Sequence, residues 1–250
     1  DVGVSMEQIS DGFYQGTLPV SNSSFDGSES ISYVIHARDQ AQGSNLAVSA
    51  SYNLEVIDLK PTSGIYSQNF EGTDANEDFA LRGWSISTQL GFEGNLLNTQ
   101  HPYQENADES AYLLRLIDTE EGLSLSYDEV VLVEPGTNNL FPSNEFKDYV
   151  VVEVSYDKGV SWVPLVDGYD SRDNNEWLAS YNANINGSNS LSVGNADLFR
   201  RNIIELPASS DNTFLRFRLV SDEQGNGWGW LIDDIVIGGA ITDLSLDENK

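Results

Sequence analysis

The chain has 250 residues, with 40 acidic and 12 basic side chains, a formal charge of −28 and no cysteine. So little basic surface argues against DNA, RNA or an anionic membrane as partner, and no apolar run is long enough for membrane insertion. Without cysteine there is no thiol catalysis, no disulfide and no cysteine-bound zinc. The acidic excess suits a saline or calcium-containing environment, or serves solubility alone.

Residues 1–58 predict strands and turns. Two long alternating strands, Ile31–Arg38 and Val48–Ile57, flank a polar turn, and Phe13–Pro19 precedes them. This hairpin resembles the last two strands of bacterial immunoglobulin-like modules. Because 58 residues are too few for a complete seven-stranded sandwich, we expect a partial immunoglobulin-like module that is incomplete alone. The beginning at Asp1 suggests an interior cut of a longer precursor.

We predict a linker at residues 59–64 and a second β unit at residues 65–240. Residues 241–250 are predicted to be an acidic tail or linker. Helical periodicity is nearly absent from the second unit. Its alternating runs are rich in β-branched and aromatic residues, as at Ala111–Ile117, Tyr149–Tyr156 and Thr213–Val220. The pattern predicts an all-β chain built as a sandwich.

Two segments bracket this second unit. It opens with Ile65-Tyr-Ser-Gln-Asn-Phe-Glu-Gly72, followed by Gly83-Trp84, and it closes with Gly229-Trp-Leu-Ile-Asp-Asp-Ile235. The bracketing, with a central hairpin turning at Asp157–Gly159, resembles the MAM-like jelly rolls, including the bacterial choice-of-anchor modules. The resemblance implies a jelly-roll β-sandwich within a large secreted or surface protein of bacteria, often exported by type IX secretion. It implies no single activity.

Two adjacent acids, Asp233 and Asp234, interrupt the apolar final strand. Alternation places them on opposite faces, so one lies near the core, where an unpaired carboxylate is unfavourable. The first and last strands of a closed jelly roll can be neighbours, which would bring Glu71 to the pair and form a structural calcium site. The resemblance also implies a cation here, and we favour Asp234 as its ligand. Alternatively, the acids cap loop amides or pair with Arg82, Arg115 or Arg218.

A second candidate site lies in the polar loop 167–182. Sugar recognition needs an aromatic face and planar polar groups, and this region together with the glycine turn supplies both: Tyr169, Asp170, Arg172, Trp177, Tyr181 and Trp228. The alternative is that Trp177 and Tyr181 pack the loop onto the sandwich. Trp84, Trp162 and Trp230 are expected in the core or in hairpin packing.

Catalytic motifs are poor. The chain has neither Gly-x-Ser-x-Gly nor His-Glu-x-x-His, and only His101-Pro-Tyr103 hints at a polysaccharide lyase. We therefore expect a non-catalytic extracellular binding or adhesion module with a structural calcium. Its expected partners are polysaccharide or a cell-surface protein, together with adjacent domains of the parent protein. The alternative is a protein-interaction or spacer domain of an exported peptidase or adhesin, and a lyase ranks third.

Overall fold

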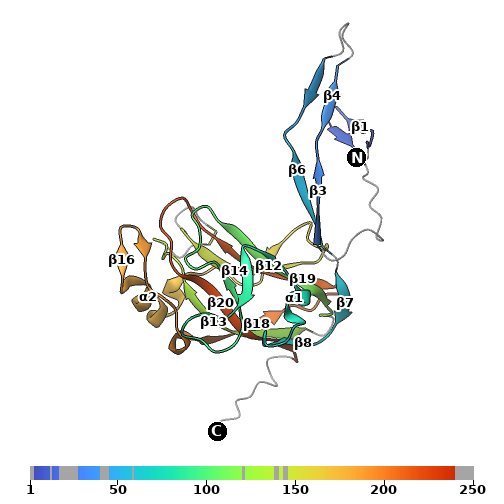
Figure 1. Cartoon of the computed structure of the whole chain (residues 1–250). Coiled ribbons are helices and arrows are strands. Elements are labelled where there is room, and N and C mark those ends of the chain that lie inside the picture. The colour runs from blue at the N-terminus through green and yellow to red at the C-terminus, as the bar shows by residue number, and fades with distance from the viewer. Residues whose placement is uncertain are drawn as a thin grey trace. The chain divides into compact units, whose positions relative to one another are not determined.

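The structure is a computed structural model that describes residues 3–11, 13–16, 28–39, 45–57, 59–119, 122–137, 141–142 and 146–239. Its contacts divide the chain into two compact units, Asp1–Asp58 and Leu59–Lys250 (Figure 1). Strands dominate both units. No helix among the described residues is long and apolar enough to cross a membrane. The expected acidic tail, 241–250, lies outside the described residues.

The described residues of the first unit form three antiparallel strand pairs. They are β1 (Glu7–Ser10) with β2 (Phe13–Gln15), β3 (Ser28–Tyr33) with β6 (Tyr52–Ile57), and β4 (His36–Arg38) with β5 (Leu46–Val48). The last two pairs form one interrupted hairpin, in which the backbone N–H of Asn45 donates to Asp39 Oδ1 at 2.9 Å near the turn. Where burial is described in this unit, no side chain is buried. The immunoglobulin-like assignment stays a prediction.

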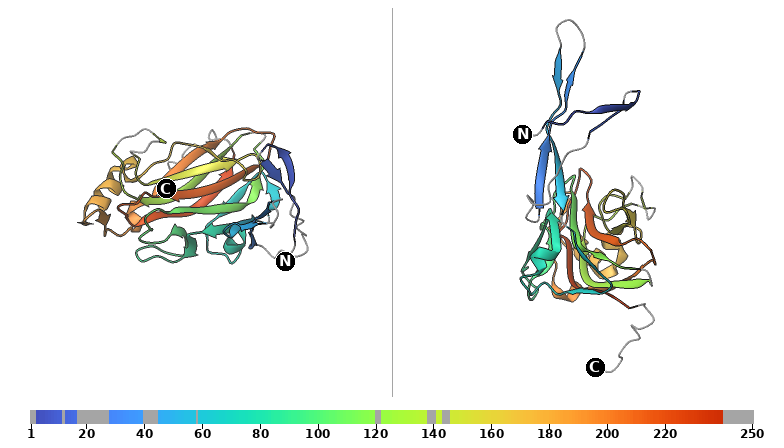
Figure 2. Two further views of the ribbon diagram at one scale, coloured as in Figure 1. Left: turned by 90° about the horizontal axis from the view of Figure 1, so that it is seen from above. Right: turned by 90° about the vertical axis from the view of Figure 1, so that its right-hand side faces the viewer.

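The second unit is built from two six-stranded sheets (Figure 2). In the first sheet the order is β10–β11–β20–β13–β18, and β8 also pairs with β20; the strands span Trp84–Ser87, Leu96–Thr99, Gly229–Gly238, Leu123–Leu132, Arg200–Leu206 and Tyr66–Gln68 respectively. In the second sheet the order is β15–β14–β19–β12–β7, and β9 also pairs with β12; these strands span Val163–Pro164, Tyr149–Ser155, Thr213–Val220, Asp108–Ile117, Lys60–Ser63 and Phe79–Arg82.

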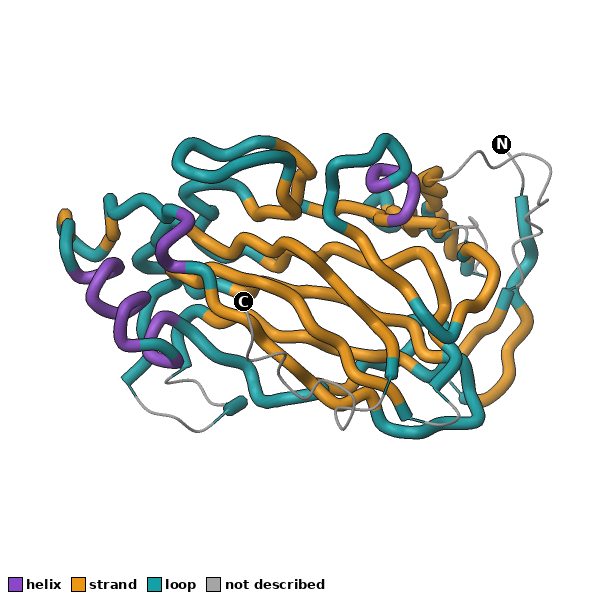
Figure 3. Tube along the Cα trace, turned by 90° about the horizontal axis from the view of Figure 1, so that it is seen from below, coloured by secondary structure: helices purple, strands orange, loops and turns teal. Residues whose placement is uncertain are grey.

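Short elements complete this unit. They are the helix α1 (Ala75–Asp78), the helix α2 (Asn175–Asn182), the 3-10 turns η2 (Ser171–Asp173) and η3 (Ala196–Leu198), and the small pair β16 (Ile185–Asn186) with β17 (Asn189–Ser190). Contacts tie α2 to β13, and the helix lies at one end of the strands (Figure 3).

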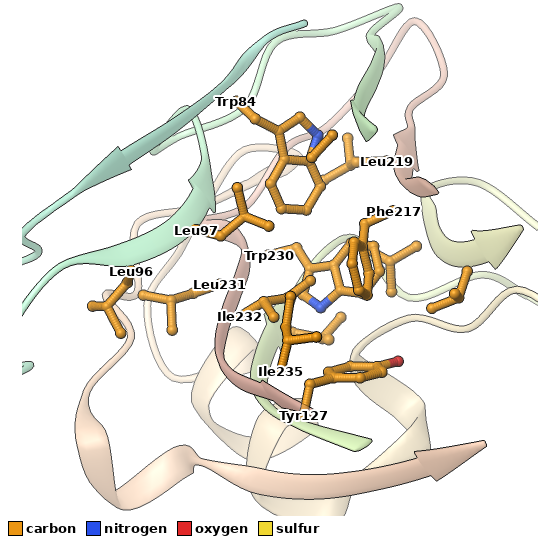
Figure 4. Packing of buried hydrophobic residues seen from close by; sticks show 14 of the residues in the cluster. Trp84, Leu96, Leu97, Tyr127, Phe217, Leu219, Trp230, Leu231, Ile232 and Ile235 are labelled. Atoms are coloured by element: carbon orange, nitrogen blue, oxygen red, sulfur yellow. The ribbon is translucent and has the colours of Figure 1, made fainter. Parts of the chain in front are cut away.

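Large apolar side chains from both sheets fill the core of the second unit. Trp230 of β20 packs edge-on against Phe217 of β19 with ring centres 5.7 Å apart, and Trp84 of β10 lies 5.4 Å from Trp230 (Figure 4). Truncating a fully buried tryptophan such as Trp230 typically costs about 3–5 kcal/mol. The predicted all-β sandwich is confirmed, and Trp84 and Trp230 belong to its core as expected.

The prediction of a linker at residues 59–64 is corrected by the structure. Residues Lys60–Ser63 form β7, which pairs in parallel with β12, with Lys60 opposite Arg115. An ion pair helps to hold it there, because Lys60 Nζ lies 2.9 Å from the buried carboxylate of Asp78. Pro61 fits such a strand because it needs no ladder donor at a sheet edge.

Candidate functional site

The final strand β20 bulges where its two adjacent acids lie. One residue of β13, Tyr127, lies opposite two residues of β20, Asp234 and Ile235. Asp234 adopts a left-handed backbone with φ of 47°, a conformation that aspartate tolerates better than most residues. Strict alternation through 231–237 was therefore the wrong expectation, since the extra residue reverses the faces of the strand.

The bulge exposes Asp234 and leaves Asp233 half-buried. The sequence argument favoured Asp234 as the ligand, and that preference stays a prediction. Asp233 lies opposite Asp128, which in turn lies opposite Arg201, so its half-buried side chain shares the face of the sheet that carries these two charged residues. Burial raises the pKa of Asp233 to about 6, and the negative charges of Asp234, Asp128 and Glu71 add to the rise. Asp233 Oδ1 accepts a hydrogen bond from the backbone N–H of Asp234 at 2.8 Å, which partly opposes that shift.

Glu71 approaches the same region from the loop after β8. This strand pairs with β20, with Gln68 opposite Ile235, so the first strand of the predicted jelly roll does lie beside the last. Glu71 is exposed, and its Oε1 accepts a hydrogen bond from the backbone N–H of Asn95 at 3.1 Å. Gly94 has φ of 74°, and a Cβ atom there would overlap the Glu71 carboxylate.

The arginines proposed as alternative partners contact other acids. Arg115 lies 3.7 Å from Asp78, and Arg218 lies 2.7 Å from Asp108. For Arg82, no ion pair with Glu71, Asp233 or Asp234 is present in the described part of the chain.

The positively charged side chain at the bulge belongs to Arg201, which the sequence analysis did not single out. Its Nη1 lies 3.2 Å from Asp128 Oδ2 and donates to the carbonyl oxygen of Asp234 at 3.4 Å, while its Nη2 donates to Ser126 Oγ at 3.0 Å. Arg201 belongs to β18, and only the strand order β20–β13–β18 brings it here. No local sequence signal carries that strand order.

A polar hollow of about 480 Å³ opens beside the bulge. Residues of β8, the acidic loop after it, β18 and β20 line it: Ser67, Gln68, Asn69, Gly72, Asp74, Arg201, Asp234, Ile235 and Val236. Hydroxyl, amide, carboxylate and guanidinium groups suit a ligand rich in hydroxyls. No aromatic ring is among these lining residues, so recognition here depends on hydrogen bonds.

The three predicted metal ligands lie in one region but do not form a tight group. The negative charges of Glu71 and Asp234 contribute to the raised pKa of Asp233. The three carboxylates offer only oxygen ligands, which suits calcium. Among the described residues, three carboxylates with oxygens within 4.8 Å of one another occur elsewhere, at Glu134, Asp148 and Asp222. A cation at the bulge would therefore need further oxygen ligands from the surrounding loops or from solvent.

The predicted polar loop 167–182 holds helical structure instead. Residues 171–173 form η2, and α2 follows, with Asn174 at its N-cap accepting a hydrogen bond from the backbone N–H of Glu176 at 2.8 Å. Trp177 and Tyr181 are four residues apart, so they share one face of the helix. The cap residue and this spacing were the available signals, but the segment is too short for sustained periodicity.

Trp177 and Tyr181 pack inward, in agreement with the alternative interpretation. They are 2% and 3% exposed. The indole N–H of Trp177 donates to the carbonyl of Leu198 at 2.8 Å, and the Tyr181 hydroxyl donates to the carbonyl of Asn226 at 3.2 Å. Neither ring offers a surface on which a sugar can stack.

Tyr169, Asp170 and Arg172 are engaged within the protein. The buried Tyr169 hydroxyl donates to Glu129 Oε2 at 2.7 Å. Asp170 is buried, and Arg172 Nη2 lies 2.6 Å from its carboxylate. The Arg172 guanidinium also lies over the ring of Phe146 at 5.2 Å. These groups stabilise the base of α2, and the six residues proposed to bind sugar form no open site.

Trp228 is likewise enclosed. Its ring stacks between His101, with centres 3.9 Å apart, and Phe92, with centres 5.7 Å apart. Burial lowers the pKa of His101 to about 4, although its hydrogen bond to the Trp228 carbonyl works in the opposite direction. Tyr103 is also buried, and it donates to Asp148. Of the His101 and Tyr103 pair behind the lyase alternative, Tyr103 therefore lies inside the fold, and His101 is half-buried against Trp228.

Solved structures with a similar course of the chain are adhesin and carbohydrate-binding domains. The K2 cleaved adhesin domain of Lys-gingipain is 15% identical, over 70% of this chain and 98% of its own, with a TM-score of 0.42. The CBM22-1 xylan-binding domain of Paenibacillus barcinonensis Xyn10C is 12% identical, over 70% and 95%, with a TM-score of 0.39. A family 35 carbohydrate-binding module from Clostridium thermocellum is 10% identical, over 71% and 100%, with a TM-score of 0.38. Likeness at this level carries no argument about function.

No curated protein matches the sequence. One family does: the sequence model of Reelin subrepeat B matches residues 109–238. The match begins in β12 and ends with β20, so it includes the bulge, three strands of the first sheet and four of the second. Because it covers more than half of the chain, the protein belongs to the Reelin subrepeat B family.

Proposed function

We propose that the second unit is a non-catalytic binding module of a larger extracellular protein, with its ligand site in the hollow beside the β20 bulge. The observation that carries this proposal is the hollow's lining, where Asn69 and Asp74 of the loop after β8 converge with Arg201 of β18 and Asp234 of β20. Paired hydrogen-bonding groups of this kind recognise the hydroxyls of a carbohydrate. The proposed partner is therefore a polysaccharide or a glycosylated cell surface.

A calcium ion held by Glu71 and Asp233 is part of the proposal. Like charges around Asp233 and its raised pKa indicate excess negative charge at the bulge, which a divalent cation would offset. Asp234, at the exposed turn of the bulge, borders the hollow. The ion would thus stabilise the wall of the ligand site rather than act on a substrate.

The same proposal places the protein outside the cell. A net charge of −28 is best tolerated where salt and divalent ions screen it. The MAM-like resemblance and export by type IX secretion belong to this proposal, as does attachment to neighbouring domains of a parent protein.

A glycan array tests the ligand site directly. Arg201→Gln removes the guanidinium that lines the hollow, and the matched control Arg82→Gln removes an exposed arginine of β9. We expect Arg201→Gln to weaken binding at least about tenfold, the effect of losing one charge-assisted hydrogen bond, and the control to bind as the wild type does. Equal glycan binding by all three proteins would contradict the proposed site. Trp177→Ala is unsuitable, since truncating that buried ring affects folding first.

A protein-interaction or spacer role is the second candidate, and a specific observation favours it. The first unit exposes several large apolar side chains: Ile9, Phe13, Tyr14, Leu46, Val48 and Tyr52. Such surfaces are typical of contacts with another protein domain. Absence of glycan binding, combined with measurable affinity for a purified neighbouring domain of the parent protein, would support this role over the first.

A further inference from the structure

A second group of carboxylates lies at the ends of three strands in the sandwich. Glu134 follows β13, Asp148 precedes β14, and Asp222 follows β19. Because Tyr149 pairs with Val220, the start of β14 and the end of β19 meet, and their flanking acids meet with them. One carboxylate oxygen from each of the three residues lies within 4.8 Å of the other two.

Hydrogen bonds hold two of these residues firmly in place. Asp148 is fully buried; its Oδ1 accepts from the backbone N–H of Asp222 at 2.9 Å, and its Oδ2 accepts from the Tyr103 hydroxyl. The same hydroxyl accepts from the backbone N–H of Glu134 at 3.0 Å. The cluster is therefore built from a connected network, and a carboxylate oxygen with one hydrogen bond still has a lone pair for a cation.

Glu134 supplies an independent sign of a missing ligand. The residue is only 7% exposed, and its Oε1 accepts from Lys147 Nζ at 2.6 Å. Its Oε2 is buried and has no hydrogen-bond partner among the described residues. A Cβ atom added to Gly225 would lie 2.6 Å from Oε2, so this oxygen faces the loop that carries Asp222. Buried polar atoms are nearly always partnered, so an unpartnered carboxylate oxygen here needs an explanation.

The charge balance points in the same direction. Lys147 provides one positive charge against three carboxylates. A bound cation with two positive charges would balance the cluster and partner Glu134 Oε2.

We propose that Glu134, Asp148 and Asp222 bind a hard divalent cation of the calcium type. Three carboxylates and neighbouring carbonyl or water oxygens match the oxygen-only coordination that calcium takes. The site lies away from the bulge, because the bulge is opposite Tyr127 within β13 whereas Glu134 follows the end of that strand. The cation would tie the loop after β19 to the ends of β13 and β14. This inference does not depend on the proposed ligand hollow or on calcium at Glu71.

Calorimetric titration of the EDTA-stripped full chain with calcium chloride tests the site. Three variants are compared with the wild type. Two are double variants, Glu134→Gln/Asp222→Asn at this cluster and Glu71→Gln/Asp233→Asn at the bulge, and the third is the exposed single control Asp211→Asn. We expect Glu134→Gln/Asp222→Asn to lose one binding equivalent, or to bind it at least about tenfold more weakly. The bulge variant and the control should keep that equivalent. If the bulge variant binds calcium just as the wild type does, no calcium binds at Glu71 and Asp233. That result would leave the site at Glu134, Asp148 and Asp222 in place.

Unchanged calcium binding by a folded Glu134→Gln/Asp222→Asn variant would overturn the proposal. Should that variant fail to fold, the single change Asp222→Asn replaces it, since Asp222 is the least buried of the three. Amide NMR spectra of the unaltered chain provide a second measurement. Calcium should shift the signals of Asp222 and Gly225, and unshifted signals at saturating calcium would also overturn it.

Discussion

The bulge of β20 and the cluster at the end of β13 both bring several carboxylates close together, but in different surroundings. At the bulge, Asp234 is exposed and Arg201 reaches Asp128, so solvent and a guanidinium relieve much of the repulsion. At the cluster, Asp148 is fully buried, and Lys147 forms an ion pair with Glu134. The comparison teaches that adjacency of acids in the sequence is a poor guide to how strongly their charges interact.

Calcium should have the largest effect on stability, and it acts on both regions. Binding only to the folded state at a hundredfold excess over the dissociation constant contributes about 2.7 kcal/mol for each site, so about 5 kcal/mol for two. Thermal unfolding in calcium and in EDTA measures this. The Asp211→Asn variant is the control and should respond as the wild type does, while equal melting temperatures in both buffers would count against both cation sites.

The second largest difference should appear between Asp148 and Asp233 without calcium. Asp148→Ala leaves the Tyr103 hydroxyl and the backbone N–H of Asp222 without their buried acceptor, which should cost about 2 kcal/mol. Asp233→Ala loses only a bond to its neighbouring amide at a half-buried position and should cost less than about 1 kcal/mol. Urea unfolding in EDTA compares the two, and a greater loss from Asp233→Ala would reverse the ranking.

The pH dependence of Asp233 should be smaller still. Its pKa rises from 3.8 to about 6 on folding, so its stabilising contribution is present below pH 3.8 and is lost as the pH rises through 6. The shift corresponds to about 3 kcal/mol, and solvent screening of this half-exposed group reduces it to about 1 kcal/mol. In EDTA, Asp233→Asn should therefore gain about 1 kcal/mol relative to the wild type between pH 4 and pH 7. A constant difference across that range would mean that Asp233 titrates normally.

Asp234 should show the smallest effect of its charge. In EDTA, Asp234→Asn keeps a side chain that tolerates the left-handed backbone and should change the unfolding free energy by less than about 0.5 kcal/mol. Asp234→Ala should cost about 1 kcal/mol for its backbone conformation alone, whether or not calcium is present. A loss from Asp234→Asn as large as that from Asp234→Ala would show that the carboxylate itself stabilises the bulge.

Local patterning predicted a strand best where one face of the strand is buried and the other is partly exposed. In β19, Phe217 and Leu219 are buried, and Arg216 and Arg218 between them are partly exposed. The neighbouring placement of β8 and β20 followed from a resemblance rather than from any local signal. The bulge was missed because one inserted residue leaves no mark in an apolar run, and β7 was missed because Pro61 and Gly64 are typical of a linker.

The candidate site was harder to predict than the fold because burial decides what each side chain can do. Trp177 and Trp228 have the chemistry of a sugar platform, but the sandwich encloses both. The polar hollow and the cluster at Glu134 each join residues from separate strands, such as Arg201 and Asp234, that only the sheet order brings together. Composition and residue spacing do not predict such contacts.

Diffraction from crystals grown with calcium chloride, recorded at a wavelength where calcium scatters anomalously, would locate the ions directly. We expect one anomalous peak against Glu71 and Asp233 and a second among Glu134, Asp148 and Asp222. A well-ordered structure at saturating calcium with no peak at either place would contradict the conclusion that these carboxylates are assembled to hold cations.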